Sequence, residues 1–210
     1  MKTITKLILI TAPLLMASNA FADTNGWYIG GEFGAGSSRC STCDTNEITG
    51  EVKSTTGSTP AFDFLGGYQF NRYFALEGGV GMLPLMQVSS TYNKTTGSNP
   101  GQRTKTNWAA VGHLYVAVKG MLPITNQFGL FGKAGFDGMG LAYNKPYDPA
   151  NEDSNNGTSA SGVGTYLAVG ASYNFSPKWA GNVSYNQINV TSGSTKFDSS
   201  YGTLGVTYLF

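Results

Sequence analysis

The sequence has 210 residues, enough for one domain of ordinary size or one small barrel. Charged residues make up 12% of it, about half the share typical of soluble domains, whereas glycine (29), tyrosine (12) and phenylalanine (12) are abundant. The formal net charge is +1, and the sequence has no stripe of basic residues. Both observations argue against nucleic acid as a partner. This composition suits a barrel whose outer wall faces lipid, and it suits a soluble enzyme poorly.

The first 22 residues have the pattern of a secretory signal peptide. Two lysines form the charged region, an apolar run over 7–17 follows, and Ala20-Phe21-Ala22 supplies an Ala-x-Ala cleavage site. The apolar run is too short for a membrane-spanning helix, which takes about 20 residues. We therefore predict a cleaved signal peptide over 1–22, with cleavage after Ala20 as the near alternative, and a single domain over 23–210.

After residue 22 no long apolar run remains, and apolar and polar residues alternate with period two. Such alternation is typical of a strand with one apolar and one polar face. In the first segment Trp27 and Phe33 share one side, and Tyr28 and Glu32 share the other. We expect strands in eight segments: 27–35, 62–70, 73–82, 106–121, 128–141, 163–175, 179–190 and 201–210.

The connections between these segments alternate between short and long. The short ones are 71–72, 123–127 and 176–178, and the long, polar ones are 37–58, 83–105, 142–161 and 191–200. Short turns at one end and long loops at the other are typical of bacterial outer-membrane barrels. Closure removes the sheet edges, whose unpaired backbone groups would each lose several kcal/mol in hydrocarbon. We expect an all-β, eight-stranded antiparallel transmembrane barrel with both chain ends on the short-turn, periplasmic side.

The charges decide which face of the strands points outward. A water-soluble barrel would place the apolar residues inside, and alternation by itself fits either arrangement. The aromatic-rich face carries almost no charge, and a lysine facing the lipid midplane would destabilise the barrel by roughly 2–4 kcal/mol. The glycine-rich face carries the charges, so we predict a charge network in the lumen, with His113 and Tyr115 beside it: Glu32, Asp63, Glu77, Lys119, Lys133 and Asp137.

Four segments resemble the OmpA-like outer-membrane β-barrel superfamily. They are GWYIGGEFGAG (26–36), FDFLGGYQFNRYFALEGGVG (62–81), LPITNQFGLFGKAGF (122–136) and YGTLGVTYLF (201–210). The last one also resembles the signal read by the barrel-assembly machinery, with apolar or aromatic residues at alternate positions up to the end: Leu204, Val206, Tyr208 and Phe210. The resemblance implies a small stand-alone barrel in the Gram-negative outer membrane, without a peptidoglycan-binding domain, whose partners are outer-membrane lipid and the assembly machinery.

His113 is the only histidine of the sequence and the natural candidate for catalysis. A catalytic histidine needs a nucleophile and an orienting group within hydrogen-bond reach. No neighbouring serine or acid completes a His-x-Ser pattern. We therefore expect a hydrogen-bonded interior histidine, no catalytic residues, no cofactor and no enzymatic activity.

Cys40 and Cys43 form a Cys-x-x-Cys motif in the first long loop. Such a motif can be redox-active, can contribute half of a zinc site, or can close a small disulfide. A thioredoxin-like setting and further zinc ligands are missing from the pattern, and the periplasm is oxidising, so a disulfide is the prediction. The acidic residues of the loop 144–158 lack the spacing of an EF-hand calcium site, and we expect no metal there.

An eight-stranded barrel has room inside for packed side chains and no wide pore. The leading hypothesis is therefore a structural and surface protein that displays polar loops outside the cell, with a lumen plugged by charge pairs and with host or surface ligands bound through the loops. The alternative is a narrow porin-like channel or a transporter of small hydrophobic compounds. The apolar residues around Pro84 either line a lateral opening for such compounds or only extend the lipid-facing band.

Overall fold

The computed structural model describes residues 25–41, 53–55, 59–94, 101–144, 157–192 and 195–210. These residues form antiparallel strands: β1 (Gly26–Ser41), β2 (Lys53–Thr55), β3 (Thr59–Asn71), β4 (Phe74–Lys94), β5 (Gly101–Pro123), β6 (Phe128–Asn144), β7 (Gly157–Asn174), β8 (Trp179–Ser192) and β9 (Thr195–Leu209). Within this described part, no helix is long and apolar enough to cross a membrane.

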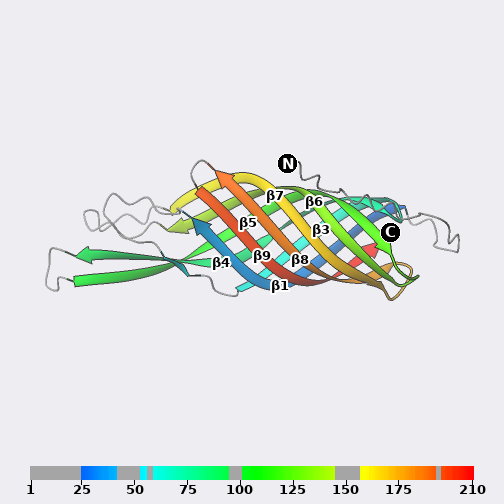
Figure 1. Ribbon diagram of the computed structural model, residues 1–210, viewed down its shortest axis with the longest axis horizontal. Coiled ribbons are helices and arrows are strands. Elements are labelled where there is room, and N and C mark those ends of the chain that lie inside the picture. Colours follow the sequence, from blue (N-terminus) through cyan, green and yellow to red (C-terminus); the bar gives the residue numbers. More distant parts are fainter. Residues whose placement is uncertain (1–24, 42–52, 56–58, 95–100, 145–156, 193–194) are drawn as a thin grey trace, which may run out of the picture.

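Eight of the described strands close into a barrel (Figure 1). Neighbours around the ring follow the order β1-β3-β4-β5-β6-β7-β8-β9, and the first and last strands pair from Tyr28↔Leu209 to Ser41↔Lys196. The three-residue strand β2 pairs with β4 outside this ring order. The expected eight-stranded antiparallel all-β barrel is confirmed.

The short turns share one device. In each, a side-chain oxygen accepts hydrogen bonds from the backbone N–H groups two and three residues further on, as Asn, Thr and Ser do in turns. Asn71 Oδ1 accepts from Tyr73 at 2.8 Å and from Phe74 at 3.0 Å. Thr125 Oγ1 and Ser176 Oγ make the same pair of bonds in the other two turns. The chain therefore reverses within a few residues at this end of the barrel.

At the other end the strands are longer than the sequence pattern predicted. The expected loop 83–105 is mostly strand, since β4 continues to Lys94 and β5 begins at Gly101; the other three expected loops are also entered by strands. The β4–β5 hairpin projects well beyond the barrel in Figure 1. A strand that leaves the bilayer can have polar residues on both faces, so its period-two alternation disappears while its backbone pairing continues.

The β4–β5 pairing is irregular around Pro84. Its register shifts between Leu83 and Met86, as in a β-bulge. Proline lacks the backbone N–H that a regular ladder requires, which explains an interruption at this position. The side chains beyond Leu83 on β4 lie outside the described residues, so a lateral opening at Pro84 stays a prediction.

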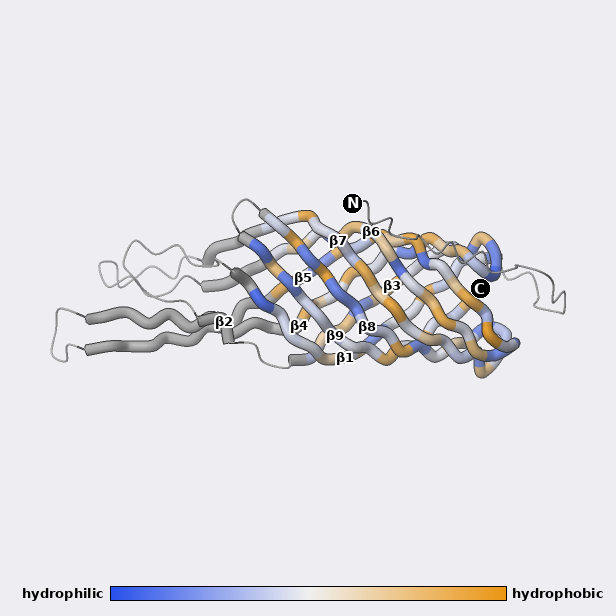
Figure 2. Tube along the Cα trace, in the orientation of Figure 1, coloured by the Kyte–Doolittle hydropathy of each residue, from blue (hydrophilic) through white to orange (hydrophobic). Residues whose placement is uncertain are grey.

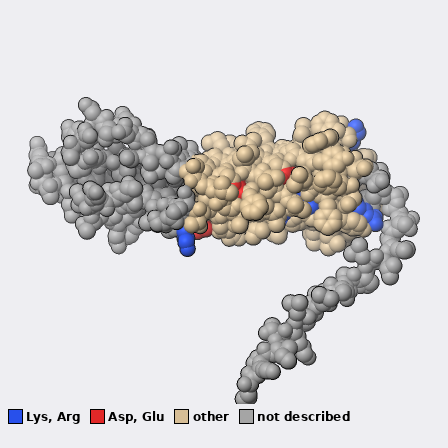
Figure 3. Space-filling view, turned by 90° about the horizontal axis from the view of Figure 1, so that it is seen from above, with Lys and Arg blue, Asp and Glu red and all other residues tan. Residues whose placement is uncertain are grey.

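The two faces of the barrel wall have opposite character. Large apolar side chains point outward and are exposed, among them Phe64 (71%), Leu114 (64%) and Leu204 (69%). The alternation along each strand is visible in the hydropathy colours of Figure 2. On the face drawn in Figure 3, Lys and Arg gather toward the two ends of the described barrel, and the wall between them is mainly uncharged. Most of the charge on the middle of the strands therefore lies inside.

Candidate functional site: the charged interior of the barrel

Charged and titratable side chains from five neighbouring strands meet inside the barrel. Each of them is at most 8% exposed. They occupy inward positions of the period-two pattern on β1, β3, β4, β5 and β6. We call these seven side chains the interior network: Glu32, Asp63, Glu77, His113, Lys119, Lys133 and Asp137.

Glu77 on β4 is the centre of the interior network. Its Oε2 accepts hydrogen bonds from Tyr28 at 2.9 Å and from Lys119 at 3.5 Å. Its Oε1 accepts one from Tyr115 at 2.9 Å and lies 2.7 Å from Lys133 Nζ, with which it forms an ion pair. The carboxylate thus has two partners on each oxygen, as a buried charge requires.

Lys133 also links opposite sides of the barrel. Its Nζ lies 3.5 Å from Glu32 Oε1. Lys133 is on β6 and Glu32 is on β1, four strands apart in either direction around the eight-stranded ring. Both side chains are almost fully buried. This ion pair therefore crosses the full width of the lumen.

A chain of neutral polar side chains continues from Glu32 along the far wall. Thr203 Oγ1 donates to Glu32 Oε2 at 2.7 Å, and Ser184 Oγ lies 3.4 Å from the same oxygen. Asn186 Nδ2 donates to Ser184 Oγ at 3.0 Å, and Tyr166 OH donates to Asn186 Oδ1 at 2.8 Å. These bonds satisfy buried groups on β7, β8 and β9, which carry no charge in this layer.

His113 lies between two carboxylates. Its Nε2 is 2.6 Å from Asp63 Oδ1, and its Nδ1 is 2.8 Å from Asp137 Oδ2. Asp63 and His113 reach each other across β4 because the residue between them is Gly81, where a Cβ atom would collide with the Asp63 carboxylate. Asp137 Oδ1 and Tyr201 OH are buried beside this group without a hydrogen-bond partner among the described residues.

Aromatic rings fill the space between these polar groups. Tyr115 stacks on Tyr166 with ring centroids 4.3 Å apart, and His113 stacks on Tyr115 at 6.0 Å. The rings of Tyr201 and His113 are nearly perpendicular, with centroids 6.4 Å apart. Because Tyr201 is on β9 and His113 is on β5, this contact also joins opposite sides of the ring.

The structure brings together all of the interior charges that the sequence singled out. Its pairing shows what the sequence could not: His113 contacts two acids that lie 50 and 24 residues away. The sequence pattern does not single out several of their partners, although these residues also occupy inward positions of the period-two alternation: Tyr28, Tyr166, Ser184, Asn186, Tyr201 and Thr203.

Most of the other predicted sites lie in parts of the chain that the structure does not describe. The signal peptide, Cys43 and the acidic loop residues 148–153 lie outside the described residues, as does the Cys40 side chain, so these expectations stay predictions. In the last strand, Leu204, Val206 and Phe210 are exposed on the outer wall. Tyr208 packs against Trp179 with ring centroids 4.9 Å apart.

The chemistry available to the interior network is ionic and hydrogen-bonding. The described residues contain no group of three side chains arranged to hold a metal ion. Both ring nitrogens of His113 face carboxylates, and its side chain is fully buried. The two carboxylates fix the orientation of the His113 ring, and no nucleophile is among its described hydrogen-bond partners.

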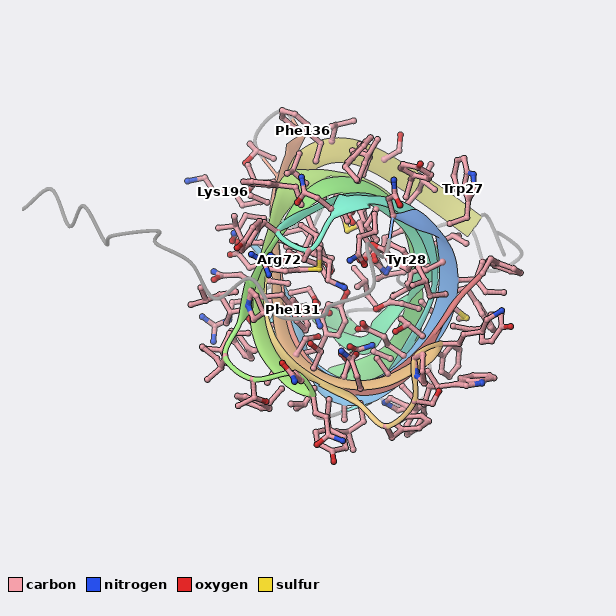
Figure 4. All side chains as sticks on the ribbon, turned by 90° about the vertical axis from the view of Figure 1, so that its right-hand side faces the viewer. Trp27, Tyr28, Arg72, Phe131, Phe136 and Lys196 are labelled. Carbon is pink, nitrogen blue, oxygen red and sulfur yellow. The ribbon has the colours of Figure 1, made fainter. Side chains whose placement is uncertain are left out.

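A cavity of about 520 Å³ opens at the short-turn end of the barrel. We call it the vestibule. Tyr28 and Lys119 line its inner part, and the residues of the turns around 125 and 176 line its rim. Figure 4 looks into this end, with Tyr28 and Phe131 inside the ring of strands and Trp27 and Phe136 outside. The vestibule thus reaches inward to Tyr28 and Lys119, which both donate hydrogen bonds to Glu77.

A family model and several solved structures match this chain over most of its length. A family model described as "Outer membrane protein beta-barrel domain" matches residues 7–210. Neisserial surface protein A has a TM-score of 0.58 and 11% identity, with 88% of this chain and 97% of that chain covered. The outer membrane protein OprG from Pseudomonas aeruginosa has a TM-score of 0.54 and 15% identity, with 90% and 97% covered. A search of curated proteins found no match.

Proposed function

The chain belongs to the outer membrane protein β-barrel domain family, as the OmpA-like resemblance of its sequence implied. On this basis we propose that it is a structural and surface protein whose lumen is closed by the interior network. The family places it in the outer membrane of Gram-negative bacteria. Its exposed apolar wall faces the lipid there, and the long-loop end faces outward from the cell. The barrel is then a scaffold for the polar segments at that end.

The observation that carries the closed lumen is the meeting of side chains from opposite strands. Lys133 and Glu32 form an ion pair across the ring, and His113 and Tyr201 make a ring contact across it. Glu77 adds contacts with four side chains of the lumen, those of Tyr28, Tyr115, Lys119 and Lys133. An eight-stranded barrel is narrow enough for such side chains to fill its interior.

The absence of enzymatic activity belongs to the same proposal. It is supported by His113, whose ring nitrogens are both engaged by Asp63 and Asp137 inside the wall. Two further partners are proposed at the surface of the barrel. The assembly machinery reads the last strand up to Phe210, and host or surface ligands bind the Ser-, Thr- and Asn-rich connections at the long-loop end.

A second candidate function is a narrow channel or a transporter of small hydrophobic compounds. The vestibule favours it, because an open space of about 520 Å³ already reaches Lys119 from the short-turn end. Under this hypothesis the interior network would have to open during passage.

Liposome swelling separates the two functions. Refolded protein is reconstituted into liposomes, and the entry of arabinose, an uncharged amino acid and a small apolar alcohol is compared with protein-free liposomes. A closed lumen predicts equal rates with and without protein for arabinose and the amino acid. Protein-dependent entry of any of these solutes would replace the first function by the second.

A further inference from the structure

The vestibule at the short-turn end has the composition of a ligand site. We propose that it binds an anionic amphiphile, a molecule with one carboxylate or phosphate group and a short apolar tail. The site goes beyond the proposed function, because it ends at Tyr28 and Lys119 and requires no passage through the barrel.

The inner end of the vestibule presents a buried ammonium group. Lys119 is 8% exposed, and its Nζ donates to Glu77 Oε2 at the long distance of 3.5 Å. Glu77 is its only hydrogen-bond acceptor among the described residues, whereas an ammonium group has three donors. Its other contacts are with the faces of the Phe131 ring at 4.7 Å and the Tyr28 ring at 5.3 Å. An oxygen acceptor in the vestibule would satisfy the remaining donors.

The charged side chains around the vestibule have one sign. Arg72 and Lys178 line it together with Lys119, and no aspartate or glutamate is among the described lining residues. Arg72 comes from the turn between β3 and β4 and lies 4.9 Å above the Tyr73 ring. Glu77 lies behind Lys119, where Lys133 also pairs with it. A ligand entering from the short-turn end therefore meets cations first, which favours an anion.

The remaining lining fits an apolar tail. Met121 and Leu209, which pack partly buried against Tyr28 and Leu65, supply apolar surface, and Ser172, Asn182 and Thr207 add neutral polar groups. The volume of about 520 Å³ lies within the range of about 300–1,000 Å³ that is usual for small-molecule pockets. A mainly apolar pocket with a few directed polar groups is the usual arrangement of such sites. The anionic group would lie at Lys119 and the tail along Met121 and Leu209.

Chemical-shift titration of the isotope-labelled protein tests this proposal. The protein is reconstituted in nanodiscs of zwitterionic lipid, and sodium octanoate is added while the backbone amide signals of Ser172, Asn182 and Thr207 are followed. We expect saturable shifts at these residues and none at Tyr166 or Asn186, which lie deeper in the barrel. Octylammonium, which has the same tail and the opposite charge, should give no saturable shifts.

Variants identify the cations responsible. Lys119→Met should weaken octanoate binding at least about tenfold, as expected for the loss of a charge-assisted hydrogen bond. Arg72→Gln, at the rim and outside the interior network, should weaken it several-fold in a barrel whose core is unchanged. Lys196→Met, at the opposite end of β9, is the matched control and should bind as the unmodified protein does. The proposal is overturned by octylammonium or octanol binding as tightly as octanoate, or by equal octanoate binding in Arg72→Gln and Lys196→Met.

Discussion

Gly81 lies opposite Asp63 on β3 and opposite His113 on β5. With hydrogen in place of a side chain, it leaves the space through which these two residues meet. Gly79 has the same role beneath the Tyr115 ring. The inward-facing glycines thus leave room for long side chains to reach over the strand between them, as Asp63 on β3 and His113 on β5 do over β4.

Gly81→Ala should destabilise the barrel. The new methyl group would collide with the Asp63 carboxylate and with the Phe62 carbonyl oxygen, so we expect a loss of about 1–3 kcal/mol in the free energy of unfolding. Gly140→Ala is the matched control, because a Cβ there has nothing within 4 Å. Urea unfolding in lipid vesicles measures both. Equal stability of the two variants would show that the Asp63–His113 contact does not depend on Gly81.

Truncation of Lys133 should reduce the stability of the barrel strongly. Lys133→Ala leaves Glu32 and Glu77 buried with one cation fewer, and breaking such a pair destabilises proteins by about 3–5 kcal/mol. Lys178→Ala removes an exposed lysine and should change stability by less than about 0.5 kcal/mol. The same unfolding experiment compares them, and a similar small change in both would contradict an interior held by charge pairs.

The individual strands show which information the sequence carries. Within the bilayer one face of a strand meets lipid and the other meets the lumen, so apolar and polar residues alternate and the strands could be predicted. Beyond the bilayer both faces meet water. The alternation stops there, so the sequence predicts a loop where β4 continues up to Lys94 and β5 begins at Gly101.

The last strand closes the ring and is also expected to direct assembly. Phe210 donates its backbone N–H to the Trp27 carbonyl oxygen at 2.9 Å, and its exposed ring contacts Tyr208 with centroids 5.3 Å apart. Phe210→Ala keeps the backbone bond and removes the ring. We predict several-fold less protein in the outer membrane of expressing cells, with unchanged refolding in vitro.

Phe136→Ala is the control for this experiment. Phe136 is as exposed as Phe210, at 66% against 65%, but it belongs to β6. If both variants reached the membrane equally well, measured by heat-modified mobility of membrane fractions, the assembly signal at Phe210 would be refuted.

For the whole barrel, the residues of the interior network could be predicted, but their partners could not. Glu32 and Lys133 could be predicted to face the lumen because they are charged and occupy inward positions of the period-two pattern. Which charges meet depends on the order of the strands around the ring, on their stagger, and on glycine positions such as Gly81. These are properties of the closed barrel, which no single segment contains.

Export should change the covalent structure of the chain in two ways, by cleavage of the signal peptide and by formation of a disulfide. We predict that protein extracted from the outer membrane begins at residue 23 and carries a disulfide between Cys40 and Cys43, because the periplasm is oxidising. Intact-mass measurement with and without reduction tests both features. Two alkylatable thiols before reduction, or a retained N-terminal segment, would contradict the respective prediction.

Single-channel recording in planar bilayers tests the closed lumen most directly. Lys133 and Glu32 meet across the ring, so the unmodified barrel should show no conductance steps or only small ones. Lys133→Ala removes the side chain that joins the two walls and should give larger or more frequent steps, while Lys178→Ala should behave like the unmodified protein. Steps of the size known for large porins in the unmodified barrel would contradict a lumen closed by the interior network.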